Sequence, residues 1–133
     1  MPQNRLTFSH SQRLKRRKEI DALFNEGKSI SNYPIRVLYK QVKPEPGIPL
    51  KVAISVPKRT FKKAVDRNRI RRQIREIYRI HKTQLWDKLL SYGITYHIML
   101  IYTGKERPGF AELSSKIIVI LQRLSKVHER DPV

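Results

Sequence analysis

The sequence contains no cysteine. That absence excludes disulfide bonds and every metal centre or iron–sulfur cluster that depends on thiolate ligands. No run approaches the eighteen or so apolar residues that a membrane-spanning helix needs. The first ten residues, MPQNRLTFSH, contain no apolar segment of signal-peptide length. These absences predict a soluble, cytoplasmic protein that does not bind membranes.

Acidic residues are scarce as well. Only 11 Asp and Glu oppose 29 Lys and Arg, and the formal net charge is +18 at pH 7. A charge of this size predicts strong attraction to polyanions, with nucleic acid as the first candidate and an anionic membrane surface as the second. The length of 133 residues suits a single domain over residues 1–133. We expect residues 1–12 and 130–133 to be flexible.

Apolar spacing predicts the first half of the fold. A short helix is expected within RLKRRKEIDALFNEGKS, residues 13–29, because apolar side chains recur there at helical spacing and Gly27 can end the helix. Two segments rich in β-branched residues, at 35–42 and 50–57, predict strands separated by a loop rich in proline. The apolar stripe of the helix comprises Leu14, Ile20, Leu23 and Phe24.

The second half alternates helix, strand and helix. A long helix is expected at 64–85, a strand within 95–104, and a last helix within 110–129. The strand is almost wholly apolar toward its end, so it is expected at the centre of the sheet. We therefore expect a mixed α/β or α+β sandwich, and the span from 50 to 104 is long enough for a βαβ crossover. The apolar face of the last helix comprises Leu113, Ile117, Ile120, Leu121 and Leu124.

The stretch DRNRIRRQIREIYR, residues 66–79, contains six arginines but only two acids, Asp66 and Glu76. At roughly 100° per residue, isoleucines and Tyr78 fall on one side of the helix together with His81. Most of the cations fall on an adjoining side, where guanidinium groups repeat about every 5.4 Å, one helical turn. Their planar forks hold phosphates bidentately. This basic side comprises Arg71, Arg72, Arg75, Arg79 and Lys82, with Arg67 near its boundary.

Because the acids needed for internal pairing are missing, this pattern favours a polyanion site over a solvated charged face. The preceding cluster PKRTFKK extends the same patch through Lys58, Arg59, Lys62 and Lys63. A second basic segment, RLKRRK at 13–18, is either another patch or the exposed start of a helix. Aromatic residues near the basic segments could stack on single-stranded RNA or pack in the core; they are Phe24, Tyr33, Tyr39 and Phe61.

Catalytic patterns are absent from the sequence. The four histidines show no metal-binding spacing, and the carboxylates form no cluster that would hold magnesium for a nuclease. No glycine-rich phosphate loop occurs. We therefore predict no catalytic residue and no metal site in the protein.

The segment AVDRNRIRRQIRE, residues 64–76, resembles the signature of the bacterial ribonuclease P protein subunit. The family carries this run on a helix that follows a strand ending like SVPK at 55–58. Upstream, RLKRRKEIDALFNEGKS and VLY at 37–39 also match the family pattern. The resemblance runs from about Leu14 to Ile120.

The resemblance implies an α+β fold, a two-layer α-β sandwich of order αβββαβα. Its mixed sheet would have about four strands, with one near residues 29–33, and a left-handed βαβ crossover. It implies an enzyme whose catalytic centre is RNA and which removes the 5′ leader from precursor tRNA. The partners would be the catalytic RNA and precursor tRNA, with no obligate protein partner. The protein would hold no cofactor, and magnesium ions would bind the RNA.

The family's functional positions can be placed on this sequence. The arginine-rich motif, expected to face the catalytic RNA, corresponds to Arg67, Asn68, Arg69, Arg71, Arg72 and Arg75, and Lys58 and Arg59 continue it. Phe24 and Tyr39 match positions that line a cleft for the single-stranded leader. Ile20 stands where the family commonly has phenylalanine, and an aliphatic side chain can pack there but cannot stack.

Three other functions compete with this one. The main alternative is a structural or ribosomal-type RNA-binding protein with no role in cleavage. A sequence-specific DNA-binding protein and a nuclease acting without RNA are two more.

Overall fold

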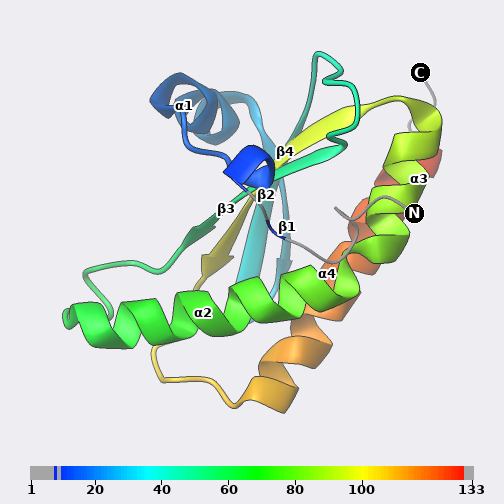
Figure 1. Cartoon of the computed structure of the whole chain (residues 1–133). Helices are drawn as coiled ribbons and strands as arrows, with labels where there is room; N and C mark the ends of the chain where they lie inside the picture. Colours follow the sequence, from blue (N-terminus) through cyan, green and yellow to red (C-terminus); the bar gives the residue numbers. More distant parts are fainter. Residues whose placement is uncertain (1–7, 9, 131–133) are drawn as a thin grey trace.

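The computed structural model describes residue 8 and residues 10–130. The predicted flexible ends fall mostly outside this part, at residues 1–7, 9 and 131–133. Within it, Gln12 is fully buried and Arg130 belongs to the last helix. The elements are η2 (His10–Gln12), α1 (Arg17–Glu26), β1 (Lys28–Asn32), β2 (Ile35–Val42), β3 (Leu50–Ser55), α2 (Ala64–His81), α3 (Thr83–Tyr92), β4 (Thr95–Tyr102) and α4 (Phe110–Arg130) (Figure 1). No helix in the described residues is long and apolar enough to cross a membrane.

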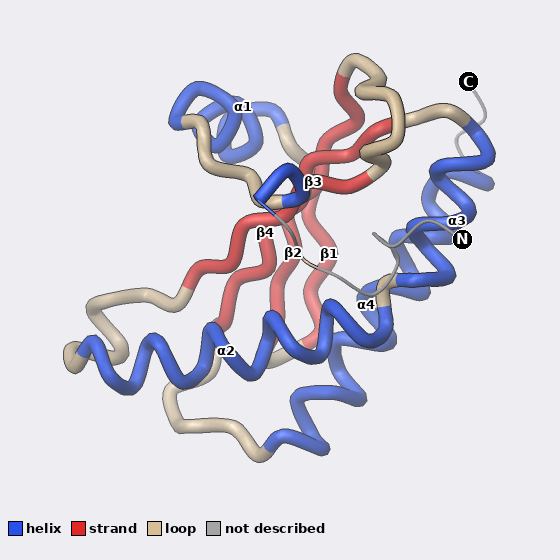
Figure 2. The backbone as a smooth tube through the Cα atoms, viewed as in Figure 1, coloured by secondary structure: helices blue, strands red, loops and turns tan. Residues whose placement is uncertain are grey.

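The strands form one mixed sheet in the order β1-β2-β4-β3 (Figure 2). β2 pairs antiparallel with β1 and with β4, whereas β3 pairs parallel with β4. The predicted central position of the 95–104 strand is confirmed, as is the extra strand near 29–33. The chain from β3 through α2 and α3 to β4 is a βαβ crossover, and its left hand stays a prediction.

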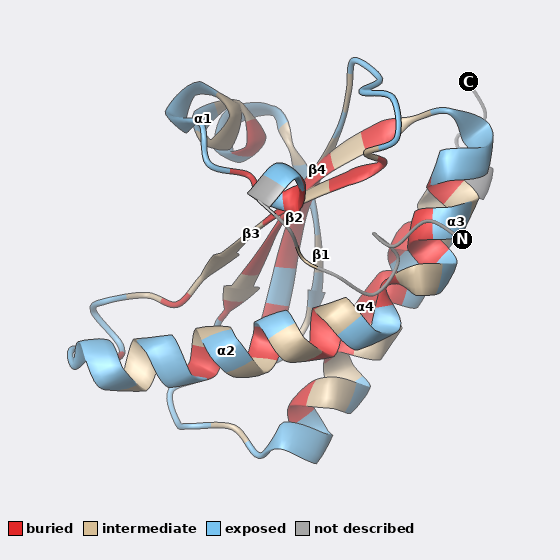
Figure 3. Cartoon of the chain, in the orientation of Figure 1, coloured by how far each residue is buried: buried red, intermediate tan, exposed pale blue. Residues whose placement is uncertain are grey.

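The main core lies between the sheet and the helices α2, α3 and α4 (Figure 3). On β2, Ile35, Val37 and Tyr39 point into this layer, because alternate residues of a strand face the same side. All five apolar residues predicted for the face of the last helix are buried. The α+β sandwich expected from the sequence is therefore confirmed.

The helix α1 lies on the opposite face of the sheet and covers part of it (Figure 1). Leu23 is fully buried there against Leu38 and Met99. The predicted apolar stripe is wrong at its two ends. Leu14 precedes the helix and its backbone N–H donates to the Val52 carbonyl at 3.0 Å, while Phe24 is 55% exposed. Gly27 follows the last residue of α1, as expected.

The predicted helix over 64–85 is also wrong, because the structure divides this segment into α2 and α3 at Lys82. Lys82 was expected on the basic surface, yet it is fully buried. Its ammonium group donates to the Gln12 side chain and lies 4.8 Å from the Trp86 ring centroid. His81, expected on the apolar side, is exposed. Burial, together with the nearby positive charge of Arg79, lowers the pKa of Lys82 to about 8.

Candidate nucleic-acid interface

The position of α2 is fixed by its apolar side. Ile70, Ile74, Ile77 and Tyr78 are fully buried against the sheet and the neighbouring helices. Burying four large side chains on one side of a helix leaves the other side facing solvent. The tertiary structure therefore presents the basic side of α2 outward along its length (Figure 3).

Arg67 fastens the start of this helix to the preceding loop. Its Nη1 donates to the Phe61 carbonyl at 2.8 Å and to the Lys62 carbonyl at 2.9 Å. Carbonyls satisfy N–H donors but do not neutralise the charge. Arg67 therefore has a structural role and still contributes a full positive charge to the surface.

The remaining arginines of α2 differ in how far the protein satisfies them. Arg79 forms an ion pair with Glu76 at 2.5 Å, and the hydrogen bond lowers the pKa of that carboxyl. Arg71 donates to the neutral Asn68 Oδ1 at 2.8 Å. Within the described part of the chain, no carboxylate lies within ion-pair distance of the exposed Arg69, Arg72 and Arg75. These arginines are therefore open to an outside anion, whereas the charge of Arg79 is already paired with Glu76.

The flanking basic cluster lies in the loop just before α2. All four of its cations, Lys58, Arg59, Lys62 and Lys63, are exposed. A turn at Pro57 begins the loop, since the Phe61 N–H donates to the Pro57 carbonyl at 3.1 Å. The structure thus joins this cluster to the first turns of α2 as one continuous positive surface.

A cleft of about 400 Å³ separates α2 from the N-terminal segment and α1. Its apolar lining comes from the sheet, the N-terminal segment and α1. Its charged lining is wholly cationic, from the 13–18 segment and from α2. We call it the basic cleft; its lining residues are Phe8, Arg13, Leu14, Lys15, Ile20, Val52, Ala53, Ile54, Arg71, Arg75 and Met99.

This cleft could not be predicted from local sequence, because one pair of its cations, Arg13 and Lys15, is more than fifty residues away from the other, Arg71 and Arg75. The guanidinium carbon of Arg13 lies over the ring of Phe8, 5.3 Å from the ring centroid. The backbone N–H of Leu14 donates a hydrogen bond to the carbonyl of Val52 in β3. These contacts place the 13–18 segment opposite α2. RLKRRK was expected to be either a second basic patch or the exposed start of a helix. The first interpretation holds for Arg13 and Lys15, because both line the cleft.

The three residues predicted to line a single leader cleft do not lie together. Ile20 lines the basic cleft. Tyr39 points to the other face of the sheet, is 8% exposed, and packs edge-on against Tyr96 with centroids 6.3 Å apart. Phe24 is exposed on α1 outside the cleft lining. Strand alternation explains the difference, since the neighbouring Leu38 takes the cleft side of β2.

Comparison with known proteins shows the family to which the chain belongs. A family model described as Ribonuclease P matches residues 8–125. The chain belongs to the ribonuclease P protein family.

Several relatives and solved structures support the assignment. The ribonuclease P protein component of Porphyromonas gingivalis is 38% identical over 103 residues, covering 77% of this chain and 75% of the relative. That of Thermotoga maritima is 36% identical over 123 residues, covering 89% and 96%. The solved RNase P protein from Thermotoga maritima matches with a TM-score of 0.65 at 28% identity, over 84% of this chain and 96% of that one. The Staphylococcus aureus protein, at 22% identity and a TM-score of 0.65, shares the fold over 85% and 94%.

Family membership makes this chain the protein component of ribonuclease P, which is an endoribonuclease of tRNA processing. The partner of the protein component is the ribonuclease P RNA. This RNA is a polyanion, and the outward basic side of α2 carries the opposite charge. No group of three or more His, Asp or Glu suited to a metal ion occurs among the residues that the structure describes.

Proposed function

We propose that the ribonuclease P RNA binds along the exposed basic side of α2 and the loop before it. The observation that carries this proposal is a set of exposed arginines that have no carboxylate partner among the described residues, on a helix whose other side is buried; they are Arg69, Arg72 and Arg75. Their contribution comes from phosphate contacts, with Lys58, Arg59, Lys62 and Lys63 extending the surface. Arg67 and Arg71 add charge, and Asn68 orients Arg71.

The basic cleft is proposed to hold the single-stranded 5′ leader of precursor tRNA. Its apolar lining, which includes Ile20, can contact bases without reading their sequence. Its arginines can bind the phosphates on either side. Arg71 and Arg75 belong both to this cleft and to the basic side of α2. One helix would therefore contact the catalytic RNA and the substrate at the same time, which suits a subunit that positions the leader relative to the catalytic RNA.

The chemistry is proposed to belong to the RNA, with no catalytic residue in the protein. The side chains that meet in the basic cleft are apolar or cationic. An arginine stays protonated in proteins and cannot act as a general base. Magnesium ions are proposed to bind RNA phosphates at the cleavage site, and the complex to act in the cytoplasm.

Reconstitution tests this function. Purified protein, ribonuclease P RNA and a precursor tRNA with a 5′ leader are combined at low magnesium, with protein alone and RNA alone as separate arms. We expect efficient leader cleavage only when protein and RNA are both present. Cleavage by the protein alone would refute the assignment of chemistry to the RNA. Binding without any gain in cleavage would favour a structural RNA-binding role instead.

A further inference from the structure

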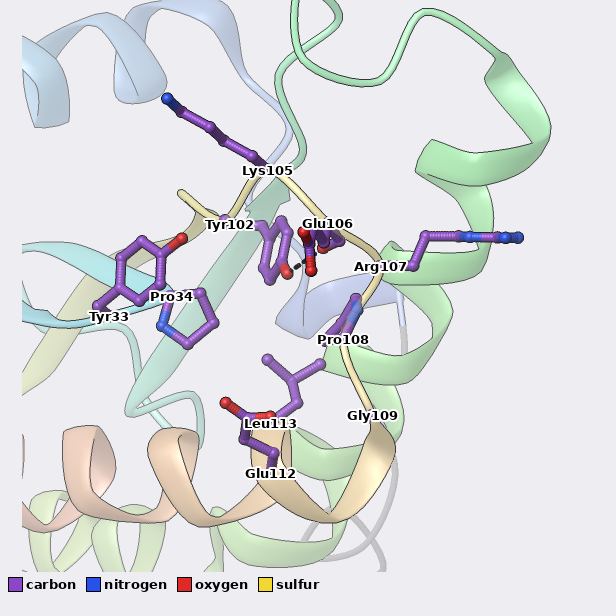
Figure 4. A pocket seen from close by; sticks show the side chains of 11 residues that line it. Tyr33, Pro34, Tyr102, Lys105, Glu106, Arg107, Pro108, Gly109, Glu112 and Leu113 are labelled. Carbon is purple, nitrogen blue, oxygen red and sulfur yellow. Dashed lines mark hydrogen bonds between the residues drawn. The ribbon is translucent and has the colours of Figure 1, made fainter.

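A second cleft, of about 410 Å³, shares no lining residue with the basic cleft (Figure 4). It is formed by the turn between β1 and β2, the loop between β4 and α4, and the first turn of α4. We call it the aromatic cleft; it is lined by Tyr33, Pro34, Tyr102, Gly104, Lys105, Glu106, Arg107, Pro108, Gly109, Glu112 and Leu113. Its volume lies in the range of small-ligand sites.

The walls of this cleft are flat rings and an aliphatic side chain. Tyr33 and Pro34 form one side, Pro108 and Leu113 another, and Tyr102 lies between them (Figure 4). Tyr102 is nearly buried, and its hydroxyl donates to the Glu106 carbonyl at 2.5 Å, which fixes the ring. Tyr33 is 67% exposed. A large exposed ring beside a fixed hollow is a stacking platform without an occupant from the described residues.

The charged residues that line the aromatic cleft are two acids and two cations: Glu106, Glu112, Lys105 and Arg107. Both acids contribute, after burial and Tyr33, to the raised pKa of Tyr102. Lys105 and Arg107 extend away from the hollow (Figure 4). Arg107 points to the start of α2, where its Nη1 lies 3.8 Å from Asp66 Oδ1. An entering group therefore meets carboxylates inside and cations at the rim.

This distribution determines which part of a nucleotide can enter. Carboxylates repel a phosphate from the interior, while the cations at the rim attract it. A carboxylate accepts hydrogen bonds from the amino and imino groups of a base edge. In the described part of the chain, no hydrogen bond or ion pair engages the Glu112 carboxylate. The rim also continues into the basic loop and first turn of α2, where RNA binding is proposed.

We propose that the aromatic cleft binds one unpaired base of the ribonuclease P RNA, stacked on Tyr33 and donating to Glu112, with its phosphates beside Lys105 and Arg107. Guanine suits the site best, because its N1–H and N2–H₂ donors lie side by side and can reach both oxygens of one carboxylate. The inference rests on the proposed function, since it assigns a further contact to the same RNA.

The test measures RNA affinity and base protection with the full chain. Kethoxal, which modifies N1 and N2 of unpaired guanines, is applied to the RNA with and without protein, and again after precursor tRNA is added. The variants are Tyr33→Ala, Tyr33→Phe and Glu112→Gln. Tyr92→Ala, which removes another exposed tyrosine, is the matched control, and Arg72→Gln reports on the α2 surface. Thermal melting verifies that every variant is folded.

We expect one guanine of the catalytic RNA to be protected by the wild-type protein and by Tyr33→Phe and Tyr92→Ala. Tyr33→Ala should expose it and weaken RNA binding by about 5- to 150-fold, the range that loss of one stacked base produces. Glu112→Gln should expose it as well. Unchanged protection and affinity in both variants, with Arg72→Gln still weakened, would overturn this inference and leave the proposed function standing.

Two other results separate the remaining possibilities. If Arg72→Gln also binds RNA as the wild type does, the proposed function itself is wrong. If protection depends on Tyr33 only in the precursor tRNA, the assignment to the catalytic RNA is overturned.

Discussion

The sharpest prediction concerns two arginines one turn apart on α2. Arg75 is exposed and faces the basic cleft, whereas Arg79 is already paired with Glu76. We consider Arg75→Gln and Arg79→Gln, which keep polar side chains of moderate length and remove one positive charge each. Because Arg75 is open to a phosphate and Arg79 is already paired with Glu76, the first change should weaken phosphate binding more than the second.

The size of the effect follows from the charges that α2 offers. Five arginines carry charge that no carboxylate of the described residues pairs at close range: Arg67, Arg69, Arg71, Arg72 and Arg75. If each neutralises one phosphate, these five alone give log K a slope against log salt of about −3.5 to −4.5, between the single-stranded and duplex limits, and phosphate contacts of the loop cations make the slope steeper. Raising monovalent salt from about 50 to about 200 mM should then weaken RNA binding by at least about 130-fold.

Titration of the labelled ribonuclease P RNA at several salt concentrations measures this slope. Arg75→Gln should make it shallower by about 0.7 to 0.9, and Arg79→Gln by less than half as much. Both variants should melt close to the wild type, because exposed substitutions change stability by about 0.5 kcal/mol or less. Equal slope changes in the two variants, or a wild-type slope near zero, would refute the reasoning.

Two further predictions concern buried side chains, Lys82 between α2 and α3 and Leu23 under α1. Lys82 has a pKa of about 8 when folded against 10.5 in the unfolded chain, so the unfolded chain binds more protons between these values. The free energy of unfolding should therefore rise with pH across that window, by about 3 kcal/mol at most, and urea unfolding of Lys82→Met should lack this rise. Leu23→Ala should lower the free energy of unfolding by about 2–5 kcal/mol, because it opens a cavity under α1. Its exposed neighbour is the control: Phe24→Ala should cost about 0.5 kcal/mol or less, and a larger loss than that of Leu23→Ala would show that α1 is turned the other way.

Lys82 shows why the end of a helix is hard to predict from spacing. A helical projection assumes one continuous helix, and it placed Lys82 on the basic side and His81 on the apolar side. The break between α2 and α3 reverses the two, so that His81 is exposed and Lys82 is buried. The groups that make this burial tolerable are Gln12, seventy residues away, and the Trp86 ring. A partner so distant in sequence leaves no local signal.

Tyr39 shows that the face of the sheet on which a strand residue lies is equally hard to predict from local sequence. Tyr39 and Leu38 are adjacent, and the segment 35–42 was correctly predicted as a strand. Which of the two would face α1 depends on the register of β2 against β1 and β4, and that register is set by packing. The sequence therefore predicted the strand but not the face that carries Tyr39.

The sequence alone determined the properties that follow from local spacing and charge. These are the strands at 35–42 and 95–102, the apolar side of α4, the basic helix, and the attraction to polyanions that a net charge of +18 brings. The tertiary structure decided which cations are open and which are already satisfied. It also gathered Arg13, Lys15, Arg71 and Arg75 around one cleft, and Tyr33 and Glu112 around another. The physical reason is that the apolar spacing of a helix or a strand repeats within a few residues and can be recognised in a short segment. Clefts and ion pairs, by contrast, form between segments that are distant in sequence and that the burial of apolar surface packs together.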